Sequence, residues 1–72
     1  MSQLSLVADG LGHLSKGQVW VNDALGEHDR LRRVRIVAPN FLGQVGVQNA
    51  TWGGETTWML RERFVEQYRR ED

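Results

Sequence analysis

Apolar and polar residues alternate over several short stretches of the chain, which predicts strands that bury one face. The first stretch, residues 18–22, combines β-branched and aromatic residues directly after Gly17. The second, residues 32–38, should end at Pro39 and Asn40, because proline cannot continue a hydrogen-bond ladder. Its inner face would consist of Val34, Ile36 and Ala38, and its outer face of Arg33, Arg35 and Val37.

Two further strands are predicted after this one. Residues 44–49 repeat the alternation with Val45 and Val47 inward, and Gly46 indicates a bulge or a sharp bend. Residues 52–55 have the Trp-Gly-Gly-Glu order of a hairpin turn, since consecutive glycines allow the positive φ angles of tight loops. The fourth strand would then cover residues 55–60.

The spacing changes after Leu60 from two residues to about four. Phe64 and Tyr68 lie four apart, and with Leu60 and Val65 they form one apolar stripe. This predicts an amphipathic helix over about 61–70, too short to persist alone. We expect its stripe to dock on the sheet, and the alternative is that it pairs with a second copy or with a partner's groove.

These elements predict a mainly β protein: a small SH3-like barrel, or a strongly bent four- to five-stranded antiparallel sheet, with a C-terminal amphipathic helix. An open four-stranded sheet capped by the helix is the alternative. Residues 1–16 show neither period and are expected to form a tail or a loosely docked segment. Residues 17–72 would form a single small domain.

Several short motifs follow one another in a characteristic order. Gly17 precedes a Gln-Val-Trp start at 18–20, a polar loop leads to Arg-Arg-Val-Arg-Ile-Val at 32–37, and Thr-Thr-Trp at 56–58 precedes Arg63 and Phe64. This order resembles that of small proteins of bacteriophages and actinobacteria. The likeness covers residues 17–68, and the turn at 41–43 and the glycine pair at 53–54 depart from it. The resemblance implies a compact SH3-like β fold with an accessory, non-catalytic role, and it supplies no catalytic residue.

Composition removes several classes of protein. The 72 residues include no cysteine and only two histidines, so disulfide scaffolds, thiolate metal sites and zinc fingers are excluded. No apolar run approaches the roughly 20 residues of a membrane helix, and the start of the chain lacks the order of a signal peptide. We therefore expect a cytoplasmic protein with no membrane partner. The chain has no phosphate-binding glycine motif, and we expect no cofactor.

Nothing in the chain predicts catalysis. Serine and threonine are the available hydroxyl nucleophiles, and none has a histidine in a recognisable motif. His28 beside Glu27 or Asp29 could serve as a base, but a solvated surface histidine is the simpler interpretation. With Asp23, the same loop could bind a hard cation, yet it lacks the ligand spacing and central glycine of a calcium loop. We predict a solubilising loop and a protein that is not an enzyme.

Charge is unevenly distributed although 9 Lys and Arg balance 9 Asp and Glu. Residues 30–54 contain no acid and hold Arg30, Arg32, Arg33 and Arg35. Period two places Arg33 and Arg35 on one strand face roughly 6.6 Å apart, near the spacing of successive phosphates in a nucleic acid. The alternative is pairing with local acids together with protection of a sheet edge. The zero net charge favours this pairing.

The three tryptophans are expected in different environments. Trp20 and Trp58 lie mid-strand, which favours core positions or half-buried cross-strand contacts. Trp52 adjoins the glycine pair, so it either packs against the helix or is exposed as an anchor for a partner.

The leading hypothesis is a non-enzymatic interaction module, phage-related or accessory, that binds a protein partner through Trp52, Arg33 and Arg35. One alternative is a nucleic-acid-binding accessory protein that uses Arg30, Arg32, Arg33 and Arg35 for phosphates. Another is a structural subunit of a homo-oligomer, since so small a domain has a thin core.

Overall fold

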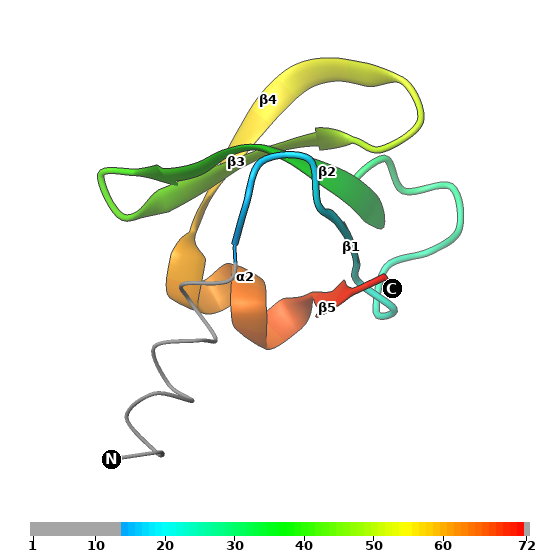
Figure 1. Ribbon diagram of the computed structural model, residues 1–72. Helices are drawn as coiled ribbons and strands as arrows, with labels where there is room; N and C mark the ends of the chain where they lie inside the picture. Colours follow the sequence, from blue (N-terminus) through cyan, green and yellow to red (C-terminus); the bar gives the residue numbers. More distant parts are fainter. Residues whose placement is uncertain (1–13, 72) are drawn as a thin grey trace.

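The alternating segments form strands because each can bury its β-branched side chains on one face. The computed structural model describes residues 14–71, and Figure 1 shows a meander of strands that ends in a short helix and a last strand. In chain order the elements are β1 (Val19–Val21), β2 (Arg33–Phe41), β3 (Gln44–Asn49), β4 (Gly53–Leu60), α2 (Arg61–Gln67) and β5 (Arg69–Arg70).

The five strands form one open antiparallel sheet in the order β4-β3-β2-β1-β5. Chain neighbours are sheet neighbours from β1 to β4, and α2 then carries the chain back so that β5 pairs with β1. In Figure 1, α2 (orange) lies on the side toward which the sheet bends, with β5 (red) beside β1. The predicted mainly β class, a bent antiparallel sheet with a C-terminal helix, is confirmed.

The core lies between the inner face of the sheet and α2. Val34, Ile36, Val45 and Val47 are fully buried, as their alternation predicts. The helix adds Phe64, whose ring lies 5.2 Å from that of Trp20 and 4.6 Å from that of Tyr68, measured between ring centroids. The predicted docking within the chain is thereby confirmed for Phe64 and Tyr68, and Val65 packs against the same core, whereas Leu60 belongs to β4 and is exposed. The core position of Trp20 is confirmed as well.

One residue of the predicted tail joins this core. Leu14 is buried among the core side chains, so the domain begins before Gly17. The rest of the predicted tail, residues 1–13, lies outside the described residues.

The predicted helix over 61–70 is too long. Tyr68 has extended backbone angles, φ −114° and ψ 151°, and the next two residues form β5 opposite Trp20 and Val21. The Tyr68 hydroxyl donates a hydrogen bond of 2.6 Å to the Leu31 carbonyl. Pairing with β1 satisfies backbone groups of a segment that would otherwise extend the helix by less than one turn.

The predicted end of the second strand at Pro39 is also wrong. β2 continues to Phe41, and its register against β3 shifts between Ile36 and Ala38 and again between Ala38 and Phe41. Pro39 lies between Ala38 and Phe41, where the pairing with β3 is already irregular. A residue without a backbone N–H therefore removes no regular inter-strand hydrogen bond at this point. The first shift sets Ala38 opposite Gly46, which moves Ala38 from the predicted inner face to the outer face.

The glycine pair begins β4 instead of forming the centre of the preceding turn. Gly53 and Gly54 both have positive φ, 71° and 87°, as their sequence predicts, but they belong to the strand. The turn itself consists of residues 50–52. Trp52 therefore occupies the last turn position before β4.

Candidate functional site

Trp52 projects from the β3–β4 turn with 79% of its surface exposed. The turn is held by Asn49, whose Oδ1 accepts hydrogen bonds from the backbone N–H groups of Thr51 and Trp52, both at 2.8 Å. The amide Nδ2 of Asn49 donates to the Arg30 carbonyl at 2.9 Å, which ties this turn to the β1–β2 loop. One asparagine thus fixes the backbone under Trp52 and links two loops at the same end of the sheet.

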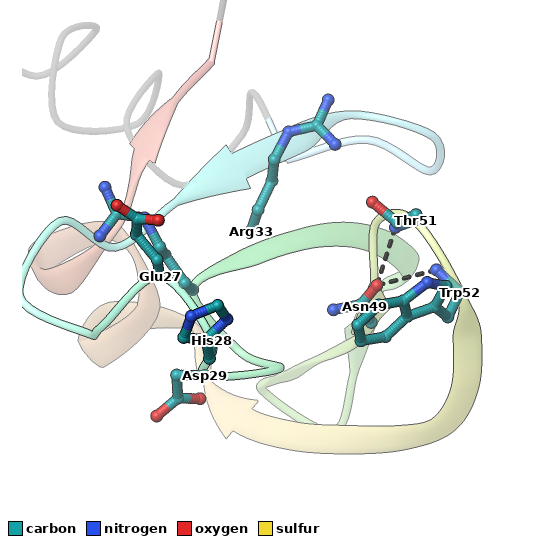
Figure 2. Close-up of a pocket in the computed structure, with 8 residues that line it drawn as sticks. Glu27, His28, Asp29, Arg33, Asn49, Thr51 and Trp52 are labelled. Carbon is teal, nitrogen blue, oxygen red and sulfur yellow. Dashed lines mark hydrogen bonds between the residues drawn. The ribbon is translucent and has the colours of Figure 1, made fainter.

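An open cleft of about 540 Å³ lies between these two loops. Figure 2 shows Glu27, His28 and Asp29 on one side, Asn49, Thr51 and Trp52 on the other, and Arg33 on the strand between them. We call this space the Trp52 cleft; Arg32 also lines it. The loop that forms its first wall is stabilised by Asp29, whose carboxylate accepts a hydrogen bond from the Leu31 N–H at 2.9 Å.

Arg33 faces the cleft but is already bound to an acid from the end of the chain. Its guanidinium donates two hydrogen bonds to Glu71, from Nε at 2.6 Å and from Nη2 at 3.0 Å. This bidentate pair lowers the pKa of Glu71 and raises the pKa of Arg33, in each case mainly through the hydrogen bond. Arg33 therefore fastens the segment after β5 to the start of β2.

Asp23 forms a second clamp on β5. Its carboxylate accepts hydrogen bonds from Arg69 at 2.5 and 3.2 Å and lies 3.7 Å from Arg32 Nη2. The hydrogen bond from Arg69 is the main cause of the lowered pKa of Asp23. Arg32 also donates to the Leu25 carbonyl at 2.7 Å. The predicted alternative for the arginines, pairing with local acids, thus holds for Arg32 through Asp23.

The remaining two arginines of the basic segment differ from these. Arg30 donates to the Thr57 hydroxyl at 3.4 Å and so reaches across to β4. Arg35 is exposed on the outer face of β2, opposite Val19 and Gln48, and has no side-chain partner within residues 14–71. The structure thus brings Trp52 and Arg33 to one cleft and leaves Arg35 outside it.

A second exposed surface was missed by sequence reasoning. Trp58 packs against Phe41 on the outer face, with ring centroids 5.5 Å apart, and Leu60 follows Trp58 on the same face of β4. Phe41, Trp58 and Leu60 are 58%, 45% and 56% exposed, and Leu42 at the β2–β3 turn is exposed as well. We call these four residues the aromatic patch. Of the two environments predicted for Trp58, the half-buried cross-strand contact is the one observed.

The sequence holds one signal for this patch, which is Gly46. On an outer sheet face, a glycine leaves room for a large neighbour to lie flat, and the alternation of β4 places Trp58 across from it. The contribution of Phe41 could not be found in this way, because it depends on the two register shifts in β2.

The acidic loop does not gather into a metal site. Within residues 14–71, no three His, Asp or Glu side chains are arranged to hold a metal ion. No helix in that part of the chain has the length and apolar character needed to cross a bilayer.

Comparison with known proteins adds no relative to this description. No protein-family profile, no curated protein and no solved structure matches the chain.

Proposed function

We propose that the protein is a non-enzymatic interaction module of the cytoplasm, phage-related or accessory, that binds a protein partner at the Trp52 cleft. The observation that supports it is the exposed indole of Trp52 on a turn whose backbone is held by Asn49. Tryptophan is enriched among the residues that dominate binding energy in protein interfaces. A side chain presented on a fixed backbone also loses less conformational entropy when it binds.

The surroundings of Trp52 suit the rim of such an interface. The wall across the cleft from the indole carries the exposed polar side chains of Glu27 and His28, and Arg33 lies between the two walls in its ion pair (Figure 2). A hydrophobic anchor surrounded by polar groups is the common anatomy of a non-obligate protein interface. A partner would insert an apolar side chain against Trp52 and meet Glu27 and His28 at the edge.

Nucleic-acid binding receives less support from the geometry. Arg32 and Arg33 form ion pairs with Asp23 and Glu71, and contact with a phosphate would require breaking those pairs. Arg35 is the one member of the predicted set without a side-chain partner in the described chain. A single exposed arginine gives only a weak electrostatic attraction to a polyanion.

The test compares two variants that each remove an exposed tryptophan, one at either end of the sheet. Immobilised wild-type protein, Trp52→Ala and Trp58→Thr are exposed to lysate of the native host, and the retained protein is identified and then purified for titration. We expect Trp52→Ala to weaken binding of that purified partner at least tenfold and Trp58→Thr to leave it within twofold. Circular dichroism confirms that both variants fold.

Salt distinguishes the two classes of partner in the same experiment. Binding anchored by an indole should change little between low and moderate salt, whereas neutralisation of several phosphates gives a steep loss of affinity. Retention of single-stranded or duplex nucleic acid with a steep salt dependence, unaffected by Trp52→Ala, would contradict the proposal.

A further inference from the structure

The aromatic patch lies at the opposite end of β3 from the Trp52 cleft and adjoins an open sheet edge. β4 is the last strand of the sheet, and no strand of residues 14–71 pairs with its outer side. Leu60 and Trp58 belong to this strand, so the apolar surface continues to the edge itself. An edge strand with unpaired backbone groups can accept another strand.

β4 has few of the features that usually prevent such pairing, and its one irregularity against β3 lies between Gly53 and Thr57, before Trp58 and Leu60. The eight residues Gly53–Leu60 contain no lysine and no proline, and Glu55 is their one charged residue. The four residues of the aromatic patch carry no charge. Apart from Glu55, neither the edge nor the patch carries a charge that would repel an identical surface, and the apolar side chains of the patch lose unfavourable exposure to water when they are covered.

We propose that a second copy of this chain covers this surface by antiparallel pairing of β4 with β4. A two-fold axis perpendicular to the sheet makes an antiparallel edge complementary to itself, as a symmetric dimer requires. The same axis keeps both outer faces on one side, so the two aromatic patches become neighbours. The registers centred on Thr57 and on Trp58 set the two Trp58 side chains diagonal and opposite to each other, respectively, within reach of aromatic rings.

The size of the surface indicates a weak dimer. Four exposed side chains of this kind present on the order of 400 Å² per copy, a patch size that is often functional on small proteins. A stable interface buries about 800 Å² per partner, and the edge strand supplies part of the difference. We expect a dissociation constant between about 1 μM and about 1 mM. This proposal does not depend on the protein partner proposed above, because the Trp52 cleft lies at the other end of the strands.

Sedimentation velocity of the full chain at increasing concentration tests the proposal. Wild-type protein should convert from monomer to dimer over the range given above, and Trp58→Thr should weaken the dimer at least tenfold. Trp52→Ala is the matched control, since it removes an exposed tryptophan at the other end, and its dissociation constant should match wild type within twofold. Leu60→Ser serves as a second variant of the patch, should Trp58→Thr unfold.

Hydrogen exchange identifies the surface independently of any variant. Backbone amides of β4 on the outer edge should become protected as the concentration rises, while those of the β3–β4 turn should not. A monomer at all concentrations would overturn the proposal. It would equally be overturned by a dimer that leaves β4 unprotected, or by protection of β4 that is independent of concentration and so arises within one chain.

Discussion

The indole of Trp58 lies directly over Gly46, so closely that a Cβ atom at position 46 would come within 2.9 Å of its Cζ3 and 3.0 Å of its Cη2. Gly46 is paired with Trp58 on one side and with Ala38 on the other. The small residues in this row form a flat floor, and the ring that lies on it contacts Phe41. The aromatic patch exists because a glycine is present at that point of β3.

We predict that Gly46→Ala displaces the Trp58 ring. The added methyl group would also approach Thr56 Cγ2 at 3.1 Å, so at least one side chain must move. Overpacking of this kind should cost about 1 kcal/mol of the free energy of unfolding, measured by urea denaturation, because the ring can move toward solvent. Gly26→Ala is the control, since a Cβ there meets nothing within 4 Å. An unchanged free energy together with an unchanged indole resonance of Trp58 would contradict the close contact.

Truncation of Phe64 should be the most damaging single change in the helix. Its ring is fully buried and touches both Trp20 and Tyr68, so Phe64→Ala leaves a cavity between α2 and the sheet. Such a change costs about 3–5 kcal/mol, a large share of the stability of so small a domain. Urea denaturation followed by circular dichroism measures it. Leu42→Ala, at an exposed turn position, should stay within about 0.5 kcal/mol of wild type.

The Tyr68 hydroxyl should make stability fall at alkaline pH. Burial raises the pKa of Tyr68 above its ordinary value of 10.0, opposed by a hydrogen bond with Asn22. The unfolded chain then loses this proton first, so the stabilisation is complete below pH 10 and is lost as the pH rises through the pKa of the folded state. Tyr68→Phe should cost about 1 kcal/mol at neutral pH and show a shallower loss of stability above pH 10.

The measurement for this residue is direct, because Tyr68 is the one tyrosine of the chain. Phenolate absorbance therefore reports its ionisation alone, in the folded and in the urea-unfolded protein. A folded-state midpoint at or below the unfolded one would contradict burial of the hydroxyl.

Acid should release β5 from the sheet. Hydrogen bonds from Arg69 and Arg33 lower the pKa values of Asp23 and Glu71, below ordinary values of 3.8 and 4.5. Stabilisation by these pairs is therefore present above those ordinary values and is lost as the pH falls through the lowered ones. NMR shifts of the Arg69 and Glu71 amides should move toward unpaired values in that range.

A variant separates this local release from general acid unfolding. Glu71→Gln removes the ion pair with Arg33. In this variant the end of β5 next to residue 71 should already be released from the sheet at neutral pH. Glu55→Gln, on β4, should leave the acid transition of β5 as it is in wild type. Coincident transitions for β5 and the core residues would instead indicate that these pairs stabilise the whole domain.

The alternation of apolar and polar residues correctly predicted those features of the fold that are set within a single strand. Val34, Ile36, Val45 and Val47 are buried because period two alone decides their face. Ala38 could not be placed in this way, because the face it occupies is set by an extra residue in β2 relative to β3. The short β5 could not be predicted either, since two residues become a strand only when β1 is beside them.

The candidate site was likewise predictable only where it depends on residues that are close together in the sequence. The turn position of Trp52 follows from the adjacent glycines, and Asn49, two and three residues before the N–H groups it accepts, is a local signal of the same turn. The partner of Arg33 lies 38 residues away in the sequence, and no local pattern indicates that pair. Because Arg33 is held in this pair, Arg35 is the one residue of the predicted strand face Arg33–Arg35 that has no side-chain partner among residues 14–71.

The separate placement of the three tryptophans makes the protein its own spectroscopic reporter. Trp20 is in the core and donates to Gln18 Oε1 at 3.1 Å, whereas Trp52 and Trp58 lie at opposite ends of the sheet and are both open to water. Each pair of phenylalanine substitutions at these positions leaves a single tryptophan, whose emission is excited selectively at wavelengths that tyrosine does not absorb. Unfolding, occupation of the cleft and coverage of the patch can then be followed as separate fluorescence signals from one unlabelled chain.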